Sequence, residues 1–448
     1  MGLFVTPKNI AITGTFGSGK SVFLLSLLNH LFNYDEKYFR LGDLREHKPL
    51  VLKGVNSLIT EETAELFPYK SFAQRLMRAG GGIWPSRHNS IQRYRVQFKR
   101  STQLKKDQVS FFSFPLERML DLQIARTDRY ADWADRVLFQ IEEDAEALRA
   151  ARPYLAHLDA QEVFVERLIR LYKVTLTKMI FDYKTCTAPS TFMIDLLGGR
   201  IDGGAPESVS QHRFLGLPPG DGSGPKEFVP LSGIARLRIP EFVETQELNY
   251  GLYRDKLLKP LFGEFNRCDS LIVLLDIPAL LSAGRGAFDE QVFLLDQLSM
   301  LLKNQHRGGQ VLGRNQIKKV ALVANKSDLV RTFEREARLP MLLRQLTDDF
   351  VEKLHKGIQV GRFICSPCVA TRHHEDPETL VGRLIHPVKN PDKIDRPFPI
   401  PEIPRVWPED YTPQDYPFYK VWPPALQAHE KLPRQYRLDD VFRFVLED

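Results

Sequence analysis

The chain has 448 residues, of which 43% are hydrophobic and 26% are charged. This is the composition of a globular protein with a sizeable core, and it excludes disorder, collagen-like repeats and coiled coil as the main organisation. The 62 Lys and Arg residues against 56 Asp and Glu residues leave a formal charge of +6, which is too small by itself to indicate nucleic-acid binding.

Four cysteines are too few for a disulfide framework in a chain of this length, so we expect a reducing compartment. No run approaches the roughly 18 consecutive apolar residues of a membrane-spanning helix, and the first residues lack the charged-then-apolar pattern of a signal peptide. The sequence therefore predicts a cytoplasmic protein with no nucleic-acid partner.

The N-terminal region predicts a strand, a glycine-rich turn and a helix. Asn9–Thr13 is a short apolar run that ends in the turn, and the dense apolar residues of Val22–Phe32 predict a buried helix behind it. The β-rich runs Tyr94–Phe98 and Gln108–Phe114 lie close together in the chain and predict a hairpin.

The remaining elements predict a helical insertion inside an α/β core. Asp121–Lys184 has few helix breakers, whereas glycine and proline make Pro189–Pro240 a region of expected loops. Beyond it, apolar strands alternate with helices, the pattern of a doubly wound sheet with mainly parallel strands. The predicted strands are Ser270–Asp276, Lys318–Ala324 and Arg362–Ser366, and the predicted helices are Phe288–Asn304 and Leu438–Leu446.

Pro387–Pro433 contains 12 prolines in 47 residues, against an average of about 5%, which predicts an extended strap. Its aromatic residues indicate packing, either onto the core of the same chain or onto a partner. The predicted parts are therefore an N-terminal core part (1–120), a helical and loop-rich insertion (121–265), a C-terminal core part (266–386), and the strap with its terminal helix (387–448).

A phosphate-binding loop is the clearest motif of the sequence. Gly14–Ser21 matches G-x-x-x-x-G-K-[ST] between a predicted strand and a predicted helix. The glycines, Gly14, Gly17 and Gly19, with Ser18 between the last two, let backbone N–H groups face a phosphate. Lys20 then reaches the β and γ oxygens, and the hydroxyl of Ser21 is a candidate Mg²⁺ ligand.

A second motif indicates guanine as the base. Asn325–Asp328 reads N-K-x-D directly after a predicted apolar strand. The carboxylate of Asp328 would accept hydrogen bonds from the N1–H and 2-amino groups of guanine. Asn325 and Lys326 are the other candidate nucleotide-binding residues of this motif. Together the two motifs predict GTP or GDP with Mg²⁺ as the bound cofactor.

The element that would sense the γ-phosphate is not settled by spacing. Asp195–Gly198 has the letters D-x-x-G but lies far from the phosphate loop in a glycine-rich region. Asp276 ends a strong apolar strand without a following glycine. Ser113–Glu117 follows a strand at a better chain position but contains no Asp.

The chain resembles the YcjX-like family, stress-associated P-loop proteins with a Ras-like GTP-binding core. The resemblance implies that fold, a stress-linked role in the cytosol or at the periphery of the inner membrane, and a membrane protein as partner. It rests on collinear segments along nearly the whole chain: Gly14–Ser21, Phe67–Tyr69, Trp84-Pro85, Arg213–Leu215, Phe228–Leu231, Tyr253-Arg254, Lys259-Pro260, Ser282–Gly284, Asn325–Asp328, Ala370-Thr371 and Arg437–Asp439.

The chain departs from the family at the γ-phosphate end. Where the family carries D-Y-P-G-E-W, this sequence has Ser113 for the Asp and Leu116 for the Gly, and it keeps Glu117. Serine is a poorer indirect Mg²⁺ ligand than a carboxylate, and leucine lacks the conformational freedom of glycine. The switch-type threonine expected near Trp84 is replaced by residues such as Ser86, His88 and Ser90.

The leading prediction is a GTPase of low intrinsic activity in which Lys20 and Glu117 are the catalytic residues. The alternatives are a pseudo-GTPase that binds nucleotide to order an interaction surface, and an ATPase in which Asn325–Asp328 matches the motif by accident. Cys365 and Cys368, with His373-His374, have the letters of a zinc cluster, although the same strand end would form the last guanine-contacting loop.

Overall fold

The structure is a computed structural model of the chain. It describes residues 5–15, 17–42, 50–58, 66–78, 82–85, 91–101, 104–126, 129–178, 227–307, 316–330, 337–385, 394–400, 402–412, 414–426, 430 and 432–447. The chain divides into two compact units, which are described separately. The first comprises Met1–Pro115, Phe265–Phe288 and Ser299–Asp448, and the second comprises Leu116–Glu264 and Asp289–Leu298.

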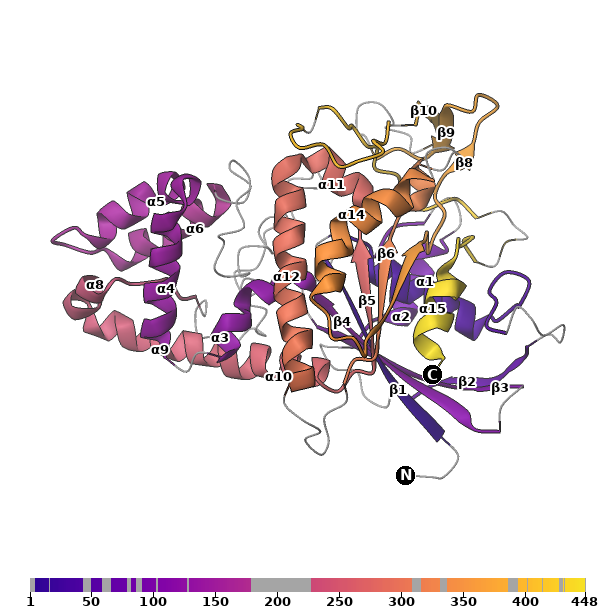
Figure 1. Cartoon of the computed structure of the whole chain (residues 1–448), viewed down its shortest axis with the longest axis horizontal. Helices are drawn as coiled ribbons and strands as arrows, with labels where there is room; N and C mark the ends of the chain where they lie inside the picture. Colours follow the sequence, from indigo (N-terminus) through magenta and orange to yellow (C-terminus); the bar gives the residue numbers. More distant parts are fainter. Residues whose placement is uncertain are drawn as a thin grey trace. The chain divides into compact units, whose positions relative to one another are not determined.

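The first unit is built on a seven-stranded, mostly parallel sheet with the order β2-β3-β4-β1-β5-β6-β7 (Figure 1). The pairs β4-β1-β5-β6-β7 are parallel, and the edge pairs β2-β3 and β3-β4 are antiparallel. The mixed α/β prediction is therefore confirmed, and the predicted hairpin is the β3-β4 pair. The strands are β1 (Val5–Gly14), β2 (Leu52–Ser57), β3 (Gln92–Arg100), β4 (Lys106–Pro115), β5 (Ser270–Leu275), β6 (Lys319–Ala324) and β7 (Gln359–Ile364).

Burial explains why the central strands read as continuous apolar runs. Every residue of β5 and β6 is buried, as expected for parallel strands that are covered on both faces. One core cluster joins the sheet to α1 (Lys20–Phe32), α2 (Tyr69–Leu76) and α15 (Leu438–Leu446). Helix α14 (Arg338–Glu352) contacts β6 and β7.

A smaller antiparallel sheet follows the main one, with the order β10-β9-β8. Its strands are β8 (Arg372–His373), β9 (Thr379–Gly382) and β10 (Arg396–Pro399). A small core of Ala370, Leu380, Leu384, Phe398, Ile400 and Val421 underlies it. Apart from β10, the described residues of the proline-rich segment (394–426) contain no helix, and their only other β-pairing is a bridge from Val421 to Leu384.

The second unit is helical. The predicted helical stretch is confirmed as far as Lys178, while the rest of it lies outside the described residues. The expectation of loops up to Pro240 is wrong at its end, because Ser232 caps a short helix by accepting the backbone N–H of Ala235. The elements are a 3₁₀ turn (Leu116–Asp121), α3 (Leu122–Arg126), α4 (Tyr130–Glu143), α5 (Ala145–Leu158), α6 (Val165–Lys178), α8 (Gly233–Arg238), α9 (Pro240–Tyr253) and a π-helical turn (Arg254–Leu258).

Three further helices and a second 3₁₀ turn (Ser327–Val330) complete the described elements. The helices are α10 (Lys259–Phe265), α11 (Ile277–Ala283) and α12 (Arg285–Arg307). The predicted helix over 288–304 is confirmed and is longer than expected. Its middle residues, 289–298, belong to the second unit and its two ends to the first.

Candidate functional site

The glycine-rich loop joins the carboxyl end of β1 to the first turn of α1. Gly17 has φ 82° and Gly19 has φ 95°, in the left-handed region where a side chain is disfavoured. At Gly19 a Cβ atom would also lie 2.6 Å from Nδ2 of Asn325. Glycine is therefore required at this position both by the backbone conformation and by the close approach of a neighbouring loop.

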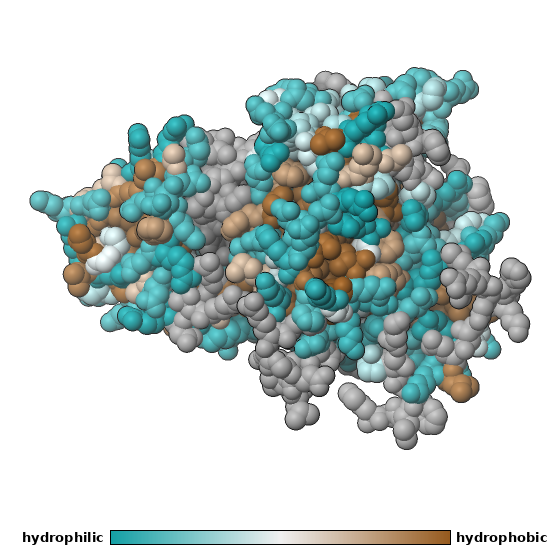
Figure 2. All heavy atoms as spheres, viewed as in Figure 1, coloured by the Kyte–Doolittle hydropathy of each residue, from teal (hydrophilic) through white to brown (hydrophobic). Residues whose placement is uncertain are grey.

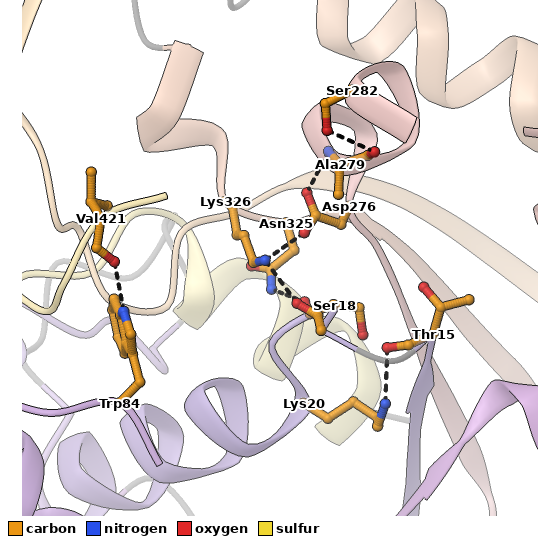
Figure 3. Close-up of polar contacts among 11 residues, drawn as sticks. Thr15, Ser18, Lys20, Trp84, Asp276, Ala279, Ser282, Asn325, Lys326 and Val421 are labelled. Carbon is orange, nitrogen blue, oxygen red and sulfur yellow. Dashed lines mark hydrogen bonds and ion pairs between the residues drawn. The ribbon is translucent and has the colours of Figure 1, made fainter. Parts of the chain in front are cut away.

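Lys20 is held inside the loop. Its ammonium Nζ donates to the carbonyl oxygen of Gly14 at 2.7 Å. It also donates to the carbonyl oxygen of Thr15 at 3.0 Å (Figure 3). Ser21 is half-buried in the first turn of α1. A cation enclosed by carbonyl oxygens beside a helix N-terminus is an arrangement that can exchange those oxygens for phosphate oxygens.

The structure brings the second motif onto this loop. The side-chain amide of Asn325 donates from Nδ2 to the carbonyl of Ser18 at 2.7 Å, and Nζ of Lys326 donates to the carbonyl of Gly17 at 2.7 Å (Figure 3). Parallel strands β1 and β6 end at the same edge of the sheet, so two motifs more than 300 residues apart meet there. The sequence motifs alone did not specify which carbonyl oxygens of the glycine-rich loop would accept these hydrogen bonds.

Asp328 is tied to the loop after β7. Its carboxylate accepts the hydroxyl of Ser366 at 2.8 Å and the backbone N–H of Ala370 at 2.9 Å, and the residue is only 4% exposed. Burial raises the pKa of Asp328, and these hydrogen bonds counteract part of that effect. An ionised carboxylate has about four acceptor positions, so about two remain beyond these two hydrogen bonds.

Ser366 lies at the strand end that was expected to form the last guanine-contacting loop, but its side-chain contacts with Asp328 were not predicted. Its hydroxyl accepts the backbone N–H of Asp328 at 2.8 Å as well as donating to the carboxylate, and it is fully buried. The available signal was its place directly after a predicted strand, at the edge of the sheet where the motif loops gather.

The candidates for a γ-phosphate sensor fall into different places. Asp276 accepts the backbone N–H of Ala279 at 3.1 Å and pairs with the ammonium of Lys326, so its carboxylate is engaged within the first unit. Ser113 is buried near the end of β4. Asp195–Gly198, Ser86, His88 and Ser90 lie outside the described residues.

Glu117 belongs to the second unit, where it follows the fully buried Leu116 in the 3₁₀ turn. It is 6% exposed and lies near Glu290 of α12. Burial, and secondarily the neighbouring carboxylate of Glu117, raise the pKa of Glu290 to about 7. This pair of carboxylates is a feature that the sequence did not predict.

The zinc alternative lacks the required geometry. Cys365 and Cys368 are buried in the main core, and burial raises the pKa of both thiols, whereas His373 and His374 are exposed. Within the described residues there is no group of three or more His, Cys, Asp or Glu side chains that could hold a metal ion.

These features describe a mixed α/β protein with a glycine-rich loop at the carboxyl edge of its sheet and an Asn-Lys loop bound to it. The chain belongs to the YcjX-like family, DUF463, whose model matches residues 9–448. No curated protein matches the chain. In the described part of the chain, no helix has both the length and the apolar character needed to cross a membrane.

Proposed function

We propose that this protein binds guanine nucleotide with Mg²⁺ in a Ras-like P-loop core and hydrolyses GTP slowly, as a stress-linked switch. The observation that carries the proposal is the contact of Asn325 and Lys326 with the carbonyls of Ser18 and Gly17. One nucleotide can span a phosphate loop and a base-recognition loop only if the two loops are neighbours. Here hydrogen bonds join the two loops directly.

The residues present fit a magnesium nucleotide. The described residues hold no cluster of acidic side chains for an all-protein metal site, but Mg²⁺ in nucleotide sites takes most of its ligands from phosphates and water. Ser21 supplies one hydroxyl at the N-terminus of α1. Bound Mg²⁺ would neutralise charge that develops on the phosphates.

The chain's own residues have separate roles in this proposal. Lys20 exchanges the carbonyls of Gly14 and Thr15 for phosphate oxygens and stabilises their charge. Asp328 selects guanine. The catalytic role of Glu117 stays a prediction from the sequence, because Glu117 belongs to the second unit and the glycine-rich loop to the first. By family resemblance, we propose that the partner is a membrane protein and that this protein acts in the cytoplasm or at the periphery of the inner membrane.

Titration calorimetry with Lys20→Ala tests the proposal. We expect wild type to bind GTP and GDP, and the variant to lose at least about 2 kcal/mol of binding free energy, because charge-assisted hydrogen bonds to phosphate are lost. Lys303→Ala, on α12, is a matched control that removes an exposed lysine elsewhere. Equal affinities of wild type and Lys20→Ala for GTP would refute the proposed phosphate site.

A pseudo-GTPase is the second candidate, and the burial of Leu116 favours it. A fully buried leucine is held by packing, whereas the glycine that it replaces would be free to turn its N–H toward a γ-phosphate. Stoichiometric GTP binding without phosphate release, with turnover gained in a Ser113→Asp, Leu116→Gly variant, would establish this reading. Tighter binding of ATP than of GTP would instead establish an ATPase.

A further inference from the structure

Asp276 lies beside the two motif loops but belongs to neither motif. It follows β5, and its side chain is 5% exposed. One carboxylate oxygen, Oδ1, accepts the backbone N–H of Ala279 at 3.1 Å and so caps α11. The other, Oδ2, lies 2.5 Å from Nζ of Lys326 (Figure 3).

Lys326 has an unusual backbone conformation for its residue type. Its φ is 60°, in the left-handed region, where residues with a Cβ atom are disfavoured. Its ammonium donates to two acceptors at once, Oδ2 of Asp276 and the carbonyl of Gly17. The left-handed turn therefore persists because its side chain is anchored at the far end.

The two acceptors have different characters. The carbonyl of Gly17 belongs to the phosphate loop and is neutral, whereas Asp276 is a nearly buried carboxylate fixed by the helix that it caps. A charge-assisted hydrogen bond to a fixed, little-hydrated anion is the stronger of the two. Asp276 therefore determines where the ammonium of Lys326 lies, and Lys326 in turn holds the carbonyl of Gly17.

We infer that Asp276 is a positioning residue of the nucleotide site, one that holds the Asn325–Asp328 loop and the Gly14–Ser21 loop in register through Lys326. The inference rests on the proposed function. In this role each of its carboxylate oxygens holds one protein donor, the backbone N–H of Ala279 on Oδ1 and the ammonium of Lys326 on Oδ2.

The test compares Asp276→Asn with Ser282→Ala in the full chain. Asn keeps the shape of the side chain and an oxygen for the N–H of Ala279, but removes the charge that attracts Lys326. Ser282 is on the same helix and its hydroxyl donates to the carbonyl of Ala279, without contacting either motif loop in the described hydrogen bonds. It therefore controls for disturbance of α11.

Binding kinetics of a fluorescent GDP analogue give the main readout. We expect GDP to dissociate about tenfold faster from Asp276→Asn, with little change in association rate, because the contact that holds the two loops in place is weakened. For GTP turnover we expect KM to rise with kcat within about twofold of wild type. Ser282→Ala should match wild type within about twofold.

A double-mutant cycle separates positioning from a general loss of stability. In a Lys326→Met background, Asp276→Asn should have no further effect on GDP dissociation, because its only proposed route to the nucleotide has been removed. An equal effect of Asp276→Asn in both backgrounds would overturn the inference, as would unchanged GDP dissociation in the single variant. If wild type itself binds no guanine nucleotide, it is the proposed function that fails.

Discussion

Asp328 has two roles in the proposed site, one structural and one in base recognition. Its carboxylate holds the 366–370 loop through hydrogen bonds from Ser366 and Ala370. Guanine presents two donors, N1–H and the 2-amino group, which need two further acceptor positions. In the proposed site the same carboxylate would therefore bind both the 366–370 loop and the base.

Asp328→Asn should therefore change base preference. The amide offers one acceptor and one donating group, which suits the 2-oxo group of xanthine better than the 2-amino group of guanine. We expect GTP affinity to fall at least about tenfold and XTP affinity to rise, measured by competition against a fluorescent nucleotide. Asp328→Ala should weaken the binding of both GTP and XTP. An Asp328→Asn variant that still prefers GTP would show that another residue recognises the base.

At the level of elements, the proline-rich segment is held by two tryptophans that donate to different parts of the first unit. The indole N–H of Trp84 donates to the carbonyl of Val421 at 2.7 Å, and that of Trp407 donates to the carbonyl of Leu342 on α14 at 2.8 Å. Trp84 packs against both hydrophobic clusters of the first unit. The segment before β3 and the segment around Val421 are therefore linked.

Trp84→Phe should loosen only the part of this segment around Val421. Loss of the indole hydrogen bond costs about 1 kcal/mol, and less ring area is buried. We expect faster hydrogen exchange at the amides of Trp422 and Ile385, which donate to Arg383 and Lys420, with little change at Arg285, which donates to Tyr411. Trp407→Phe is the matched control and should show the opposite pattern. Uniform acceleration in both variants would argue against two separate anchors.

Local pattern predicted elements that have a continuous apolar run or a clear apolar period, and it missed a strand that has neither. The terminal helix was predicted with its observed bounds, Leu438–Leu446, because its apolar residues have a clear helical period. Strand β2 was missed because its polar sequence Leu52–Ser57 pairs only at the edge of the sheet. The motif residues were found by spacing, whereas Asp276 and Ser366 act through contacts between strand ends, which no local pattern encodes.

For the whole molecule, two buried titratable groups give the two units opposite responses to pH. His30 of the first unit stacks on Phe39, and burial, partly offset by Asp439, lowers its pKa from 6.5 to about 4. Glu290 of the second unit has its pKa raised from 4.5 to about 7 by burial and by Glu117. Each shift makes the free energy of unfolding depend on pH, with opposite signs.

Between pH 4 and 6.5 the unfolded chain binds a proton at His30 that the folded chain lacks, so this group makes stability rise with pH. Between pH 4.5 and 7 the folded chain keeps a proton on Glu290 that the unfolded chain has released, so this group makes stability fall as pH rises. The windows overlap, and in wild type the two contributions partly cancel.

Removing either group should expose the other. From about pH 5 to about pH 6.5, we expect the melting temperature of Glu290→Gln to rise more steeply with pH than that of wild type, and that of His30→Phe to rise less steeply or to fall. Each contribution is about 1 kcal/mol over this range, allowing for the partial exposure of Glu290, which corresponds to a shift of about 1–2 °C. Calorimetric melting at the two pH values provides the measurement, with Lys303→Ala as a variant expected to keep the wild-type slope. The sign of each group's contribution to the slope of melting temperature against pH follows from its pKa shift. If the slopes of the two variants do not deviate from the wild-type slope in opposite directions, these two groups do not govern the pH response.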